Sequence, residues 1–96
     1  MADDWARLER EVAGLVVGEL DGRDWTLQSA CLSVGQIASR LGSSAEGTSR
    51  AISRLVHEGR LRCYSATPRA DGSDADRLLA LAPTRRLMHE LGRILD

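Results

Sequence analysis

Residues 32–62, LSVGQIASRLGSSAEGTSRAISRLVHEGRLR, decide the fold of this chain. Ser33 with Gln36 three positions later is the pattern of a capping box, which satisfies two backbone amides at the start of a helix. Apolar residues then recur at helical spacing up to Gly42, a residue suited to ending a helix. The sequence therefore predicts a short helix whose buried stripe comprises Val34, Ile37, Ala38 and Leu41.

A second helix is predicted directly after this glycine. In one interpretation Ser43 caps it and Glu46 closes a second capping box, and in the other Ser44 is the cap. Gly59 ends it. Its apolar face comprises Thr48, Ile52, Leu55 and Val56, and its other face comprises Glu46, Gly47, Ser49, Arg50, Ser53, Arg54 and His57. Residues 33–58 therefore form two capped helices with a tight turn, a helix-turn-helix.

The rest of the chain surrounds this pair with a hairpin and two terminal helices. A wing hairpin is expected over residues 61–82, with a return strand over residues 77–81. Pro83 suits the first position of a last helix over residues 83–96. The expected fold class is mainly α with a small β-hairpin wing, in a single domain over residues 1–96.

The first helix is expected within residues 1–22. Its apolar residues recur at helical spacing over about 18 residues, and Asp3 or Asp4 supplies the N-cap. Gly22 follows its end. After it, Trp25 and Leu27 alternate with a threonine and favour a very short strand. Both terminal helices carry an apolar face wider than one small domain needs, which favours pairing of two copies.

Composition excludes several classes of protein. The chain has 96 residues, 43% of them hydrophobic, which is typical of one globular domain and not of disorder. No apolar run approaches the roughly 18 residues of a membrane span, and the N-terminus lacks a signal pattern. We expect a cytoplasmic protein without a membrane partner. No nucleophile–base set, phosphate loop or carboxylate pair is evident, so an enzyme is not expected.

The two cysteines, Cys31 and Cys63, do not form a disulfide scaffold. Neither has a second cysteine or a histidine at metal-ligand spacing, so no metal and no cofactor are expected. They are interpreted as small buried hydrophobic residues, and the alternative is a redox-sensing thiol.

Charge is distributed unevenly along the chain. Its formal net charge is -1, and all 13 basic residues are arginine. Residues 1–28 carry a net charge of -4, residues 29–62 carry +3, and residues 63–96 carry 0. A local basic face can bind phosphates in a slightly acidic molecule, because screening limits the field to about 8–10 Å.

The second helix of the pair is the candidate DNA-binding element. With its apolar face held by its neighbours, its outer face can enter the major groove of duplex DNA. The predicted DNA-binding residues are Ser44, Glu46, Gly47, Ser49, Arg50, Ser53 and Arg54, with Arg69 at the wing tip and Arg77 on the return strand. The alternative is a core helix with a solvated arginine face. Glu46 is interpreted as a cap rather than an acceptor from cytosine, and Tyr64 as a packed strand residue rather than a phosphate contact.

These same residues resemble the DNA-binding core of winged helix-turn-helix transcription regulators. Ile37-Ala38 before Arg40-Leu41-Gly42, then Thr48-Ser49-Arg50, Leu55 and Glu58-Gly59, is similar to the MarR (multiple antibiotic resistance regulator) type. Residues 68–91, PRADGSDADRLLALAPTRRLMHEL, resemble the wing and exit of that family. The short chain is closer in length to ArsR-type regulators, a second choice, but lacks their metal-binding cysteine pairs.

The resemblance implies a sequence-specific regulator of transcription that binds double-stranded DNA. It would act as a homodimer on a near-palindromic site, with the terminal helices forming the dimer contact. Two alternatives stay open: a winged-helix module for protein–protein interaction without DNA binding, and a thiol-based redox-responsive regulator. The sequence indicates no small-molecule effector.

Overall fold

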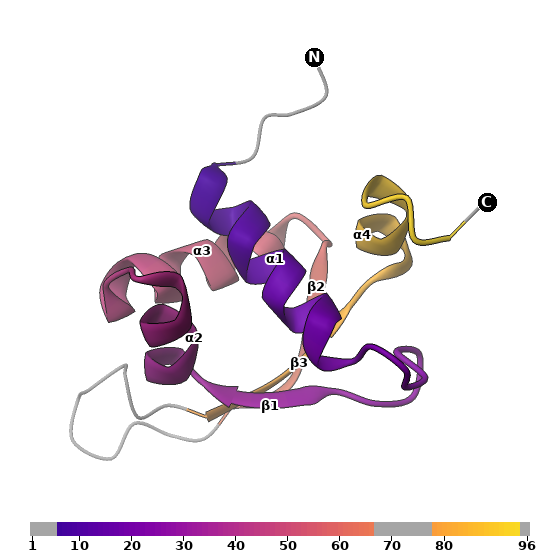
Figure 1. The fold of residues 1–96 in the computed structure, drawn as a ribbon, viewed down its shortest axis with the longest axis horizontal. Helices are drawn as coiled ribbons and strands as arrows, with labels where there is room; N and C mark the ends of the chain where they lie inside the picture. The colour runs from indigo at the N-terminus through magenta and orange to yellow at the C-terminus, as the bar shows by residue number, and fades with distance from the viewer. Residues whose placement is uncertain (1–5, 67–77, 95–96) are drawn as a thin grey trace.

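The computed structural model describes residues 6–66 and 78–94. In this part of the chain four helices pack on one side of a three-stranded antiparallel sheet (Figure 1). The elements are α1 (Arg7–Glu19), β1 (Ala30–Ser33), α2 (Val34–Leu41), α3 (Ala45–His57), β2 (Leu61–Ala66), β3 (Leu78–Pro83) and α4 (Arg85–Glu90). In Figure 1, α1 lies over the centre of the molecule, α2 and α3 lie to one side of it, and α4 lies to the other.

The capped pair of helices is confirmed. The hydroxyl of Ser33 accepts a hydrogen bond from the Gln36 amide at 3.0 Å, and the Gln36 side chain accepts from the Ser33 amide at 2.9 Å. Gly42 ends α2 in the left-handed conformation at φ 66°, where a side chain would be strained. Ser44, not Ser43, caps α3, because its hydroxyl accepts from the Gly47 amide.

The start of α1 differs from the prediction. The helix begins at Arg7 and its N-cap residue Ala6 is extended, whereas Asp3 and Asp4, predicted as the cap, lie outside the described residues. Leu8 is the first described side chain of the helix that packs on the core. Short helices depend on such packing more than on their own propensity, which accounts for the later start.

The short strand predicted around Trp25 is wrong. Residues 25–27 form a turn, in which Asp24 Oδ1 accepts a hydrogen bond from the Thr26 amide at 3.0 Å. The strand is instead β1, whose Ala30 and Leu32 are buried while the residue between them is exposed. It pairs with β3, which also pairs with β2, so the expected hairpin is part of a three-stranded sheet in the order β1-β3-β2.

The last helix is shorter than residues 83–96. Pro83 is the final residue of β3, and Thr84 caps α4 by accepting from the Leu87 amide at 3.2 Å. The Thr84 hydroxyl also donates to the carbonyl of Gly59 at 2.6 Å, which ties the start of α4 to the end of α3. Gly92, at φ 71°, ends the helical stretch.

The core lies between α1, α3 and the sheet. Its most buried large side chains include Val12, Val16, Ile37, Leu55, Leu61, Leu81 and Leu87. In the described part of the chain, α1 packs its apolar residues against this core, with Val12, Ala13, Val16 and Val17 buried, and α4 has six residues, so neither helix presents the wide exposed apolar face that was expected. Among the described residues, no helix combines the length and apolar character that crossing a membrane requires.

Candidate nucleic-acid interface

One side of α3 is fixed by packing and the opposite side faces solvent. Its buried residues are Thr48, Ala51, Ile52 and Leu55, which pack in the core that α1, α2 and β2 share. Ser43 supports this side as well, since its hydroxyl forms a hydrogen bond of 2.7 Å with the hydroxyl of Thr48. Helical periodicity then directs the remaining residues of the 13-residue helix outward.

The centre of the outward side is a stripe of four exposed residues: Glu46, Arg50, Ser53 and His57. The Arg50 side chain is 71% exposed and its Nη2 lies 3.4 Å from Glu46 Oε2. Glu46 does not act as the predicted cap, because the cap at Ser44 accepts its bond from the Gly47 amide. Such an exposed pair four residues apart contributes only about 0.3–0.5 kcal/mol, so Arg50 is free to exchange this partner for another.

The flank of α3 that faces α1 carries Gly47 and Arg54. A Cβ atom on Gly47 would lie 3.0 Å from the hydroxyl of its own helix cap and 3.8 Å from Cδ2 of Leu8, so this glycine borders α1 rather than open solvent. Arg54 Nε lies 3.2 Å from Glu9 Oε2, and the Glu9 side chain is only 5% exposed. The two predicted arginines thus differ, because Arg54 is held by a buried carboxylate of α1.

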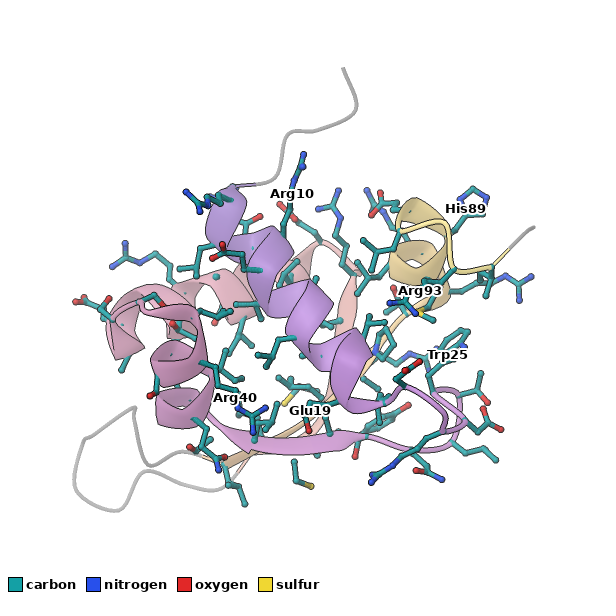
Figure 2. All side chains as sticks on the ribbon, in the orientation of Figure 1. Arg10, Glu19, Trp25, Arg40, His89 and Arg93 are labelled. Atoms are coloured by element: carbon teal, nitrogen blue, oxygen red, sulfur yellow. The ribbon has the colours of Figure 1, made fainter. Side chains whose placement is uncertain are left out.

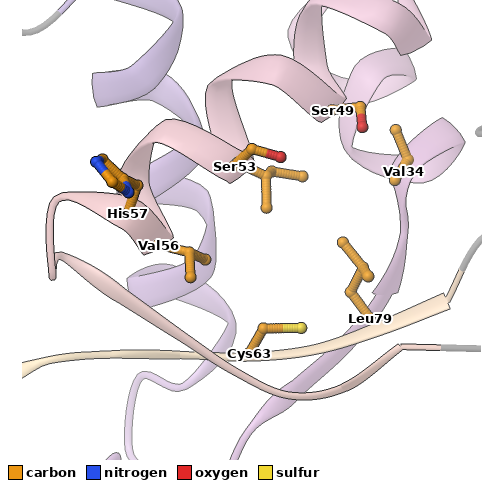
Figure 3. Close-up of a pocket in the computed structure, with 8 residues that line it drawn as sticks. Val34, Ser49, Ser53, Val56, His57, Cys63 and Leu79 are labelled. Carbon is orange, nitrogen blue, oxygen red and sulfur yellow. The ribbon is translucent and has the colours of Figure 1, made fainter.

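The opposite flank of α3 forms a groove with the sheet. The groove has a volume of about 350 Å³ and is lined by Val34, Ser49, Ile52, Ser53, Val56, His57, Cys63 and Leu79. Figure 3 shows Cys63 on the strand side, across the groove from the α3 side chains. Val56 was predicted on the apolar face, yet it is 38% exposed at the rim of this groove.

The cysteines occupy opposite faces of the sheet. Cys31 pairs with Ala80 and Cys63 pairs with Leu81, and neighbouring residues of a strand point to opposite faces. Both cysteines are exposed, so the prediction of two buried hydrophobic residues is wrong. Because β3 separates their strands as well, they cannot form a disulfide within one chain.

The arginines of residues 29–62 do not form one continuous basic surface. The structure pairs Arg40 with Glu19, Arg50 with Glu46, Arg54 with Glu9 and more distantly with Glu58, Arg60 with Glu58 and Glu90, and Arg62 with Tyr64. In Figure 2, Arg40 and Glu19 lie together between α2 and the end of α1, at a distance of 2.6 Å. Acidic residues therefore neutralise much of the positive charge counted along the sequence, and three of them, Glu9, Glu19 and Glu90, come from α1 and α4.

A charge network that the sequence did not reveal connects α3 to α4. Arg60 is nearly buried; its Nε donates to Glu90 at 2.8 Å and its Nη1 donates to Glu58. Arg86 Nη1 donates to the backbone carbonyl of Glu58 at 2.8 Å. Burial alone would raise the pKa of Glu90, but the hydrogen bond and positive charge of Arg60 outweigh it and lower that pKa. The same hydrogen bond raises the pKa of Arg60.

The predicted wing contacts fall partly outside the described residues. Arg69 and Arg77 lie there, and the structure describes no position for either. Tyr64 on β2 is 54% exposed and accepts a hydrogen bond from Arg62 Nη1 at 3.3 Å, so its interpretation as a packed residue is wrong. It lies at an irregularity of the β2–β3 register, between Cys63 and Ser65.

Comparisons with protein-family models, with curated proteins and with solved structures find no match to this chain. Within the described residues, no group of three or more histidine, cysteine, aspartate or glutamate side chains is placed to hold a metal ion.

Proposed function

We propose that this protein is a winged helix-turn-helix regulator that binds double-stranded DNA through the exposed side of α3. The observation that carries the proposal is the position of Arg50, whose side chain is 71% exposed at the centre of a helix that three other elements hold from behind. An α-helix is about 10–12 Å across with its side chains, and the major groove of B-DNA is about 12 Å wide.

The order of the elements supports this proposal. A helix and a short strand precede α2 and α3, which a three-residue turn joins, and a strand pair follows before the last helix. In this arrangement the second helix of the turn enters the groove and the strand pair acts as a wing beside it. The MarR-like resemblance fits the same order, with the ArsR type as the second choice.

The residues proposed to contact DNA have different roles. Arg50 would contact a base edge, and a bidentate contact with guanine discriminates by about 1–3 kcal/mol. Ser49 and Ser53 carry short hydroxyl side chains toward the groove beside the sheet, where a phosphate backbone can pass. Ser44 and Glu46 lie at the first turn of α3, which would approach the groove first.

A homodimer on a near-palindromic site is part of the proposal, because one recognition helix covers only one half-site. Two such helices would lie roughly 34 Å apart, one turn of DNA. The apolar face of α1 cannot supply the dimer contact, since its residues Val12, Ala13, Val16 and Val17 are buried in their own core. The stoichiometry of the DNA complex, measured by analytical ultracentrifugation, tests this part on its own.

The proposal is tested by selecting genomic DNA fragments on the purified protein and titrating a selected fragment at about 50 and 200 mM salt. A DNA-binding protein loses affinity steeply over this range, because each phosphate contact releases counterions. Failure to select any fragment at the lower salt concentration would refute DNA binding. That result would favour the alternative of a winged-helix module for protein–protein interaction.

A further inference from the structure

We infer that Glu9 is a positioning and specificity-determining residue for DNA recognition, an inference that rests on the proposed function. Its carboxylate comes from the first turn of α1 and is 5% exposed, yet it lies 3.2 Å from the guanidinium of Arg54 on α3. Glu9 holds Arg54 along the flank of its helix. This contact withdraws one of the two arginines of α3 from the DNA and leaves Arg50 as the arginine directed at the groove.

Burial explains why this ion pair persists when DNA is present. A charged carboxylate that has lost its water must keep a charged or hydrogen-bonding partner, and its partner is Arg54. The Arg50–Glu46 pair is different, because its side chains are 71% and 82% exposed and water can replace either partner. Arg50 therefore leaves its partner readily, whereas Arg54 does not.

The Glu9–Arg54 pair also lies beside Arg50, the arginine proposed to contact DNA. One shallow hollow between α1 and α3 is bordered by Glu9, Gly47, Arg50 and Arg54. Without Glu9, the ion pair left to Arg54 among the described residues is the more distant one with Glu58 at 3.8 Å, and the Arg54 side chain is long enough to swing across this hollow toward the exposed stripe. There it would contact phosphates, which strengthens binding to every sequence alike. By holding Arg54 back, Glu9 increases the ratio of specific to non-specific binding.

The experiment compares the wild type with Glu9→Met and the matched control Glu11→Met. Glu11 lies on the same helix and its substitution changes the net charge equally, but its side chain is 38% exposed and its partner Arg7 is 91% exposed. Affinity for a selected DNA fragment and for a scrambled one is titrated over a salt series. Methionine suits the buried position of Glu9, and Glu9→Gln keeps its shape if Glu9→Met does not fold.

In Glu9→Met we expect the plot of log affinity against log salt to steepen by about 0.9, the value for one added phosphate contact. We also expect the preference for the selected fragment to fall, while Glu11→Met keeps the slope and the preference of the wild type. In the free protein, nuclear magnetic resonance should show slow solvent exchange of the Arg54 Nε–H in the wild type and fast exchange in Glu9→Met.

Two failures can be distinguished. If the wild type binds DNA but the Glu9 and Glu11 variants have equal slopes and equal preferences, the role of Glu9 is overturned and DNA binding stands. If the wild type binds no DNA at about 50 mM salt, the proposed function is overturned and the role of Glu9 falls with it.

Discussion

Replacing Arg54 with alanine should destabilise the fold itself, besides any effect on DNA. The substitution removes the partner of Glu9, whose side chain is 5% exposed, and leaves a buried carboxylate without its ion-pair partner. Breaking a fully buried ion pair costs about 3–5 kcal/mol. Here the Arg54 side chain is 64% exposed, so water screens part of the interaction and a loss of about 1–3 kcal/mol is expected.

The matched control is Arg50→Ala on the same helix. Its partner Glu46 is 82% exposed, so the expected loss is less than about 0.5 kcal/mol. Urea unfolding followed by circular dichroism gives both free energies of unfolding, and a loss of 1 kcal/mol lowers Tm by about 4–8 °C in a domain of this size.

A compensating variant separates the ion pair from simple loss of packing. Arg54→Ala combined with Glu9→Met should recover most of the lost stability, because the buried charge is then absent. Equal stability of Arg54→Ala and Arg50→Ala would show that the buried Glu9–Arg54 pair does not stabilise the fold, and so would a double variant no more stable than Arg54→Ala.

Three further predictions concern other parts of the molecule. Ser33→Ala removes the cap of α2 and should cost about 0.5–2 kcal/mol in urea unfolding, whereas an unchanged midpoint would contradict the observed cap. The pKa of Glu90 is lowered beside Arg60, so this pair stabilises the fold above the pKa of an unfolded glutamate, about 4.3, and the stability is lost as pH falls through the lower pKa of the folded state. Glu90→Gln should therefore lose less stability than the wild type between about pH 5 and 2. Parallel curves of stability against pH would argue against the charge network of Arg60 and Glu90. Alkylating Cys63 with a bulky maleimide should block DNA binding, because the maleimide group fills the groove beside α3, while the same reaction at Cys31 should not. Each thiol is tested in a variant in which the other cysteine is replaced by serine. Equal effects of the two reactions would show that DNA does not pass over this groove.

Local signals in the sequence predicted the helix pair well. The capping box of Ser33 and Gln36 and the left-handed Gly42 depend on residues within one turn of each other, so their spacing is sufficient to locate the ends of α2. The two strands β2 and β3 were also expected, because the turn formers between them are close in sequence.

Two features that the sequence did not predict correctly are β1 and the length of the last helix. β1 has four residues, and it is a strand because it pairs with β3, which begins 45 residues after Ser33. Its sequence alone is too short to show a period. The terminal helix was overestimated because apolar spacing continued past Leu91, although Gly92 turns the chain there at φ 71°.

The sequence predicted which residues of the candidate interface are exposed, but not which ion pairs they form. Helical periodicity placed Arg50 and Arg54 on the outer side of one helix, and the structure exposes both side chains. Counting charges along the chain could not reveal that Glu9, 45 positions away, would hold one of them. Sequence separation says nothing about which acidic residue the fold brings to a given arginine.

Recognition of a base in duplex DNA by Arg50 of α3 can be measured directly. Fluorescence anisotropy should compare the wild type, Arg50→Ala and the control Arg7→Ala, whose side chain is 91% exposed on α1, on a selected fragment and its scrambled counterpart. We expect Arg50→Ala to lose about 1–3 kcal/mol of discrimination between the two fragments while Arg7→Ala keeps it. Wild-type discrimination in Arg50→Ala would show that Arg50 does not recognise a base.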